Sequence, residues 1–190
     1  MSLRMALLGL LTAKGAANGY ELTKAFGDTL SHVWSAQHSQ VYPELARMAE
    51  AGLVTAEDEG PRGRKRYSVT EAGGEELRRW LTEVEPSRTV RNEVALRAFL
   101  LPSLGATAAA QLVREEEKFY RQRAEAIAQL RDSLQAPDTP GFGAYAAELG
   151  VRLSTAIADW AEWAAGRLES EAGDVREAEP DDREHGTHEA

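Results

Sequence analysis

Two groups of side chains in the first half of the chain have the chemistry to bind a nucleic acid. The first is a cluster of four cations within five residues. It consists of Arg62, Arg64, Lys65 and Arg66. The second is a polar sequence that begins at Ser39 and includes Gln40 and Tyr42. Cationic and hydroxyl groups bind phosphates, and a glutamine amide can make paired hydrogen bonds with adenine.

The apolar spacing before this polar sequence predicts two helices. Leucine and alanine residues recur at spacings of three and four between Leu3 and Leu11, which is the pattern of a short amphipathic helix. A loop of small residues follows over 15–19. Within it, Asn18 can cap the next helix because its side chain accepts a hydrogen bond from a backbone N–H. We expect that second helix over 20–30.

A third helix should carry the polar sequence, and a β-hairpin should carry the cations. The third helix is predicted to begin near Ser39 and to end at Gly52, because glycine adopts the left-handed conformation at a helix end freely. Short β-forming stretches over 53–57 and 65–69 enclose the turn-rich loop 58–63. That arrangement is typical of a hairpin.

Three helices followed by a hairpin are the order of a winged helix-turn-helix, and a fourth helix over 71–84, capped by Thr70, completes it. In that fold the third helix enters the major groove, and the hairpin tip lies along phosphates or in the minor groove. Alternatives remain for each group. The cations could form a solvated turn, Gln40 could be an ordinary surface residue, and Tyr42 could be a half-buried packing residue.

The formal net charge of -9 is unfavourable for a protein that binds nucleic acid, but the charge is unevenly distributed. Residues 1–84 carry 10 Lys and Arg against 11 Asp and Glu, whereas residues 169–190 carry 2 against 9. The acidity is therefore concentrated in the tail, outside the predicted winged domain.

The chain beyond 85–87 is predicted to be helical. Helices are expected over 91–101, over 107–134 and, after a break, over a segment with apolar residues from Phe142 to Ala164. Their apolar stripes should pack in a hairpin within the chain and also against the same helices of a second copy.

These elements predict a mainly α fold, with an N-terminal winged helix-turn-helix that has a two-stranded β-wing, followed by an all-α C-terminal dimerisation domain. The predicted regions are a DNA-binding domain over 1–84, a helical dimerisation and effector domain over 88–169, and an acidic disordered tail over 170–190. Three tryptophans could line a site for a small planar aromatic effector, although packing in the core is the alternative for each. They are Trp34, Trp160 and Trp163.

No arrangement of residues indicates catalysis, because the sequence has neither a nucleophile elbow nor a glycine-rich phosphate loop. The absence of cysteine excludes disulfides and thiolate metal sites, and His185 and His188 lack a third metal ligand nearby. No apolar run reaches the roughly 18 residues that a membrane helix needs, and residues 4–13 are interpreted as a buried helix rather than a signal peptide. We therefore expect a cytoplasmic protein that is not an enzyme and that needs no cofactor or metal.

Five motifs in continuous order over residues 4–84 resemble the PadR family of bacterial regulators. They are Met5-Ala-Leu-Leu-Gly-Leu-Leu11, Gly19-Tyr-Glu-Leu22, Ser39-Gln-Val-Tyr-Pro-Glu-Leu45, Gly52-Leu-Val54 and Gly63-Arg-Lys-Arg-Tyr-Ser-Val-Thr-Glu-Ala-Gly73. The segment 90–101 and the two long helices after it are similar to the longer subgroup, which has a Vir-type C-terminal helical domain. The chain departs from the family pattern at Ser39, where a glycine often stands.

The resemblance implies a homodimer that binds a palindromic operator in double-stranded DNA, represses transcription and releases the DNA when a small molecule binds. It assigns DNA contact to the third helix and the wing. Two alternatives remain open. One is a regulator that responds to a partner protein, and the other is a helical scaffold protein whose winged domain binds protein rather than DNA. The resemblance assigns DNA contact to Ser39, Gln40, Tyr42, Arg62, Arg64, Lys65 and Arg66.

Overall fold

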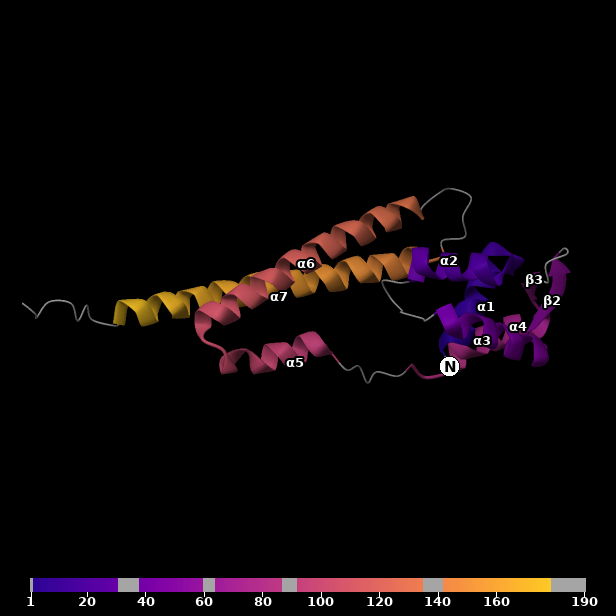
Figure 1. The fold of residues 1–190 in the computed structure, drawn as a ribbon, viewed down its shortest axis with the longest axis horizontal. Coiled ribbons are helices and arrows are strands. Elements are labelled where there is room, and N and C mark those ends of the chain that lie inside the picture. The colour runs from indigo at the N-terminus through magenta and orange to yellow at the C-terminus, as the bar shows by residue number, and fades with distance from the viewer. Residues whose placement is uncertain (1, 31–37, 60–63, 87–91, 135–141, 179–190) are drawn as a thin grey trace, which may run out of the picture. The chain divides into compact units, whose positions relative to one another are not determined.

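A computed structural model describes most of the chain (Figure 1). The described residues are 2–30, 38–59, 64–86, 92–134 and 142–178. They form two compact units, the first made of 1–88 with 127–150 and the second of 89–126 with 151–190. The predicted division into domains at residues 84–88 stays a prediction.

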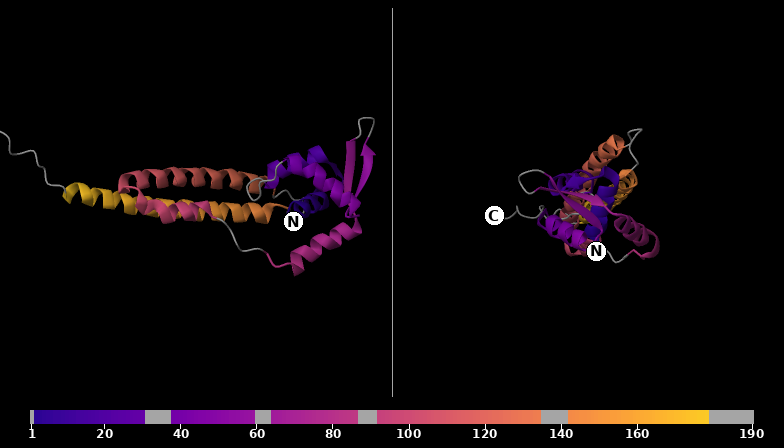
Figure 2. Two further views of the ribbon diagram at one scale, coloured as in Figure 1. Left: turned by 60° about the horizontal axis from the view of Figure 1, so that its bottom comes forward. Right: turned by 90° about the vertical axis from the view of Figure 1, so that its right-hand side faces the viewer.

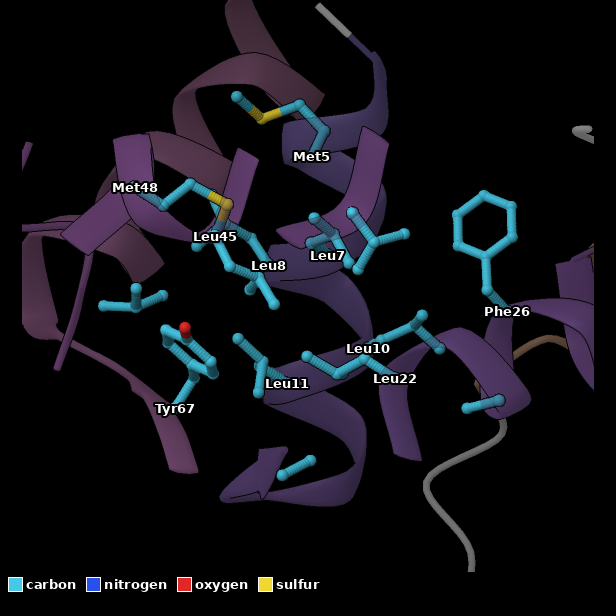
Figure 3. Packing of buried hydrophobic residues seen from close by; sticks show 14 residues of the cluster. Met5, Leu7, Leu8, Leu10, Leu11, Leu22, Phe26, Leu45, Met48 and Tyr67 are labelled. Atoms are coloured by element: carbon cyan, nitrogen blue, oxygen red, sulfur yellow. The ribbon is translucent and has the colours of Figure 1, made fainter. Parts of the chain in front are cut away.

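The first unit is built around its first helix, α1 (Ser2–Lys14). Leu7 and Leu11, which belong to the predicted apolar stripe, are fully or almost fully buried. Met5 and Leu8 are buried as well, although they lie outside that stripe. The reason is that α1 contacts three other helices and the sheet, so more than one of its faces is covered. Figure 3 shows its leucines among side chains that include Leu22, Leu45 and Tyr67.

The helices α2 (Gly19–Leu30) and α3 (His38–Glu50) are the two helices of the predicted helix-turn-helix. The start of α2 is a capping box, in which the Asn18 side chain accepts from the Glu21 N–H at 3.0 Å and the Glu21 carboxylate accepts from the Asn18 N–H at 3.0 Å. After α3, Gly52 has a φ of 70°. Its N–H and the next one donate to carbonyls in the last turn of α3 at 3.0 and 2.9 Å. The predicted cap at the start of α2 and the predicted glycine at the end of α3 are therefore confirmed.

The predicted hairpin is confirmed as β2 (Val54–Glu59) paired antiparallel with β3 (Arg64–Val69). A third strand, β1 (Ala17–Asn18), pairs with the other edge of β3 and begins opposite Tyr67, so the sheet order is β1-β3-β2. Figure 2 shows this sheet beside the helices of the first unit. The expectation of a loop over 15–19 is wrong at these two residues, because two residues are too few to show the alternation that marks a strand.

The helix α4 (Glu71–Glu83) completes the first unit. The Thr70 hydroxyl accepts from the N–H of Gly73 at 3.1 Å, which confirms the predicted cap. Gly73 is buried against the carbonyl of Leu53, where an added Cβ would overlap that oxygen. Glycine therefore allows the first turn of α4 to lie directly on the start of the hairpin.

The second half of the chain is helical, as predicted. It consists of α5 (Glu93–Leu100), a 3₁₀ turn (Leu101–Ser103) and the long helices α6 (Ala106–Ser133) and α7 (Ala144–Ala178). In the second unit, small side chains fill the contact between α6 and α7. The buried cluster there is Val113, Ala161, Ala164 and Ala165.

Arginines of α6 pair with carboxylates of α7 along this contact. Arg114 donates two hydrogen bonds to Glu169, both at 2.9 Å. Arg121 donates to Asp159 at 2.8 Å and to Glu162 at 2.9 Å. The two arginines lie two helical turns apart, and so do Glu162 and Glu169, so the pairs fix the antiparallel register of the two helices.

Several large apolar residues of α7 face away from this contact. Tyr145 is 90% exposed, Leu149 54% and Leu153 56%. The residues that α7 buries instead are small: Ala147, Ser154, Ala158, Ala161, Ala164 and Ala165. The predicted stripe from Phe142 onwards therefore marks mainly the outer face of α7, and alanine spacing marks its inner face.

The expected disordered tail over 170–190 is wrong in its first nine residues, because α7 continues to Ala178. Five of the eight residues in 171–178 are glutamate, alanine or arginine, which are good helix formers. Extending an existing helix requires no new nucleation, so the loss of apolar spacing does not end it. The rest of the predicted tail, 179–190, lies outside the described residues.

Candidate nucleic-acid interface

The orientation of α3 follows from three buried side chains on one of its faces. These are Val41, Leu45 and Met48, with 2%, 0% and 0% exposure. The first turn of the helix consequently presents Ser39 and Gln40 to solvent, where both are exposed. The sequence-predicted contact residues on α3 are thus placed on the outer surface of the first unit.

Tyr42 combines packing with exposure. Its ring lies against Gly19 at the start of α2, where an added Cβ would overlap the ring, yet 55% of Tyr42 remains exposed. Burial raises the pKa of Tyr67 on β3, and the neighbouring Tyr42 raises it further. Tyr42 therefore lies where α2, α3 and the sheet meet, and its position is fixed from several sides.

Tyr20, the second residue of α2, is a candidate that the sequence reasoning did not assign. It is 70% exposed and adjoins Gly19, against which Tyr42 packs. The capping box at Asn18 holds the turn that carries it. Its signal in the sequence is an aromatic residue two positions after the helix cap, with no apolar residue three or four positions later to bury it.

Glu44 lies on α3, two residues after Tyr42, but does not belong to the outer surface. The residue is 8% exposed. Its carboxylate accepts from Arg4 Nε of α1 at 2.8 Å and from Arg47 of α3. A buried carboxylate requires such partners, and here they tie the third helix to the first.

The structure describes the side chains of two of the four wing cations, and these two differ in exposure and in contacts. Lys65 is exposed opposite Asp58 on β2. Arg66 is half-buried and donates to the carbonyl oxygen of Ala16 at 3.0 Å, beside β1. Arg64 begins β3, but its side chain lies outside the described residues, and so does Arg62. Of the described pair, Lys65 is the more available cation, and Arg66 also supports the sheet.

The candidate effector residues do not form a pocket in the described part of the chain. Trp34 lies outside the described residues. Trp160 is half-buried against the alanine cluster, and the hollow beside it holds about 10 Å³, roughly the room that one water needs. Trp163 is 62% exposed, and the guanidinium carbon of Arg167 lies 5.9 Å from its ring centroid. Their role in binding an effector stays a prediction.

The described residues were also compared with the requirements of a membrane-spanning helix and of a metal site. Among them, no helix has the length and apolar character that crossing a bilayer requires. In the same part of the chain, no group of three His, Cys, Asp or Glu side chains is placed to hold a metal ion. The predicted tail histidines, His185 and His188, lie outside it.

Comparison with known proteins places this architecture in a family. Residues 7–79 match the model of the transcriptional regulator PadR-like family, and residues 90–169 match the model described as virulence activator alpha C-term. The crystal structure of Bacillus subtilis PadR in complex with p-coumaric acid is 30% identical with a TM-score of 0.77, and the match covers 89% of this chain and 99% of that one. The chain belongs to the PadR-like family of transcriptional regulators. Both the resemblance and the winged-helix fold are thus confirmed.

Two further matches agree with this family. The negative transcriptional regulator PadR of Bacillus subtilis is 36% identical over 118 residues, and the match spans 60% of this chain and 64% of that protein. The crystal structure of Bacillus subtilis PadR in complex with operator DNA is 29% identical with a TM-score of 0.76, covering 88% of this chain and 99% of that one. Members of this family regulate transcription and are not enzymes, as the sequence predicted.

Proposed function

We propose that the chain binds a palindromic operator as a homodimer and represses transcription from it. The observation that carries this proposal is the outer surface of the helix-turn-helix. Ser39 and Gln40 point outward from α3, and the exposed Tyr20 extends that surface onto α2. A helix with such side chains in its first turn fits the major groove, and hydroxyl groups at its margins reach phosphates. The operator complex of Bacillus subtilis PadR supports the same use of the fold.

Two contrasting faces support the dimer. The outer face of α7 carries exposed Tyr145, Leu149 and Leu153, which recur every four residues. The outer face of α6 is mostly polar, because Lys118 and Gln122, at the same spacing, are exposed and only Phe119 beside them is apolar, with 54% exposure. Solvent covers a polar face readily, whereas an apolar face of this length indicates a protein partner. A second copy of α7 is a suitable partner, and a dimer would present two winged domains to two half-sites.

The repressor is proposed to release DNA when a small aromatic molecule binds, and to act in the cytoplasm. The name of the Bacillus subtilis relative, a negative transcriptional regulator, supports repression. The complex of that protein with p-coumaric acid supports an aromatic effector.

The experiment that tests operator binding is fluorescence anisotropy with DNA from upstream of the chain's own gene. Gln40→Ala should weaken binding about tenfold, because a paired contact with a base is worth about 1–3 kcal/mol. Glu50→Ala is the matched control, since Glu50 is exposed at the other end of α3. Equal affinities of wild type and Gln40→Ala would remove Gln40 from the interface. A chain that binds no such DNA, but binds a protein through the winged domain, would support the scaffold alternative.

A further inference from the structure

The hairpin that carries the wing cations also carries an equal number of acidic residues opposite them. Three cross-strand pairs each join an acidic residue of β2 to a basic residue of β3. They are Glu57 with Arg66, Asp58 with Lys65, and Glu59 with Arg64. Residues directly opposite in an antiparallel pair share one face of the sheet, with Cα atoms about 4.5–5.5 Å apart. These paired residues therefore have no net charge.

Toward its tip, the hairpin has one basic edge and one acidic edge. In the sheet order β1-β3-β2, β2 is an outer strand, and Glu57 and Asp58 on it are exposed. The strand on the other side of β3, β1, pairs only with Tyr67 and Arg66. In the described part of the chain, the hairpin beyond Arg66 is consequently two-stranded. Its basic edge is β3, with Lys65, and its acidic edge is β2, with Asp58.

Such a hairpin attracts DNA in one orientation only. When the basic edge faces the phosphates, the cations are closer to them than the carboxylates are, by about one strand spacing of 4.8 Å. Salt screens charges over about 8 Å, so this difference lets attraction exceed repulsion. When the acidic edge faces the phosphates, repulsion exceeds attraction. Averaged over all orientations, residues without net charge contribute little to binding.

Operator and non-operator DNA differ in whether they fix this orientation. Non-specific binding depends on the phosphates and lets a protein slide and hop, so many orientations are sampled. A recognition helix that contacts base edges in the major groove has one orientation. The hairpin is attached to that helix here, because the Leu53 N–H donates to the carbonyl oxygen of Met48 on α3 at 2.9 Å. Fixing α3 therefore also fixes which edge of the hairpin faces the DNA backbone.

We propose that Glu57 and Asp58 are specificity-determining residues, which weaken binding to non-operator DNA more than binding to the operator. The inference rests on the proposed function, because it requires an operator that α3 reads. A purely structural role of the two carboxylates predicts a different result. If they only stabilised the hairpin through cross-strand pairing, their removal would loosen the wing and weaken binding to every DNA.

The test is fluorescence anisotropy of the full chain at fixed salt concentration with two duplexes. One comes from the DNA upstream of the chain's own gene, and the other has the same length and base composition in scrambled order. Glu57→Gln with Asp58→Asn removes two negative charges per protomer and should strengthen binding to the scrambled duplex about tenfold. Binding to the operator should strengthen less than about threefold, because the acidic edge faces away from the phosphates there. The ratio of the two affinities should therefore fall.

Two control variants separate charge from packing and from position. Glu57→Asp with Asp58→Glu keeps both charges and should retain the wild-type ratio. Glu75→Gln with Glu83→Gln removes two exposed carboxylates from α4, outside the hairpin, and should also retain it.

An unchanged or higher ratio in Glu57→Gln with Asp58→Asn, weaker binding to both duplexes, or an equal fall of the ratio in the α4 variant would overturn the proposal. Wild type that binds both duplexes equally, or neither, would contradict the proposed function and this proposal with it. Because the wild type is measured separately, the two failures are distinguishable.

Discussion

The winged unit, which consists of α1 to α4 and the sheet, and the α6–α7 pair fill their interiors in opposite ways. The winged unit buries its largest apolar side chains completely, among them Leu8, Leu22 and Leu45. The helix pair buries mainly alanines and leaves large apolar side chains outside, including Leu149, Leu153 and Trp163. The first pattern describes a unit that is complete within one chain. The second describes a helix pair whose largest apolar face still requires a partner.

The two regions also differ in the interactions that hold their helices in place. In the winged unit, close packing and helix caps fix the helices, and Arg4 with Glu44 adds one link to α3. Between α6 and α7, contact through alanine buries little surface. Arginine–carboxylate pairs, such as Arg114 with Glu169, fix the register of the two helices. Such exposed pairs contribute little energy, so burial of the outer apolar face by a second copy should supply much of the stability of this region.

The largest expected effect is in the core of the winged unit. Leu45→Ala should lower the free energy of unfolding by about 2–5 kcal/mol, because it removes buried methyl groups and leaves a cavity. Leu81→Ala in the same unit is the control, since Leu81 is 66% exposed and should lose less than about 1 kcal/mol. Urea unfolding followed by circular dichroism measures both. Equal losses would contradict the description of this unit as the one with the complete core.

The next largest effect is expected on dimerisation through the exposed apolar face of α7. Leu149→Glu should raise the dissociation constant of the dimer by about 100-fold, because it places a charge in an apolar contact. Sedimentation velocity over a concentration series measures this shift. Gln122→Glu adds the same charge to the polar face of α6 and should leave the dimer intact. A Leu149→Glu chain that dimerises like wild type would remove this face from the interface.

A smaller effect separates the two described cations of the wing. Lys65→Ala should weaken DNA binding and leave stability unchanged, because Lys65 is exposed. Arg66→Ala should instead lower stability, by about 1 kcal/mol, since it removes the bond to the Ala16 carbonyl. Anisotropy and thermal unfolding of both variants make the comparison. If Arg66→Ala were as stable as Lys65→Ala, the hydrogen bond to Ala16 would contribute nothing to the stability of the fold.

The smallest effect is on pH dependence, where the two regions should respond at opposite ends of the scale. Burial raises the pKa of Tyr67 above its ordinary 10.0, so the stability from its neutral form is full below about pH 10 and is lost as pH rises through the raised pKa. The hydrogen bonds from Arg114 lower the pKa of Glu169 below 4.5, so that contribution is full above about pH 4.5 and is lost as pH falls through the lowered pKa.

Unfolding of two variants across pH checks this. Tyr67→Phe should flatten only the alkaline limb of the stability profile, and Glu169→Gln only the acidic limb. A variant that flattens the other limb, or neither, would contradict the assignment of these shifts.

Much of the winged domain could be predicted from the sequence, because its signals are local. Asn18, Thr70 and Gly52 mark helix ends through side-chain or backbone chemistry that one turn contains. The burial of Glu44 could not be predicted, since it depends on Arg4, 40 residues away in the chain. The two-residue strand β1 was missed for the same reason, because only its pairing with β3 defines it.

The helical region was harder to interpret because its apolar pattern fits packing within one chain and packing against a second chain equally well. Large residues such as Tyr145 and Leu149 have helical spacing, but spacing does not say whether the covering partner is the same chain or another. The inner face carries Ala158 and Ala161, and alanine contributes little to an apolar pattern. The end of α7 was misplaced because acidic helix formers extend a helix without an apolar face.

The central claim is that the completed winged unit binds DNA while the α7 faces join two copies. The most direct test is the salt dependence of operator affinity for the full chain. With Arg66 engaged by Ala16, about three phosphates per protomer are neutralised, and a dimer should give a slope of log K against log salt of roughly -5. The same preparation carrying Lys65→Ala should lose about two units of that slope. A flat response, or an unchanged slope in Lys65→Ala, would contradict DNA binding through this wing.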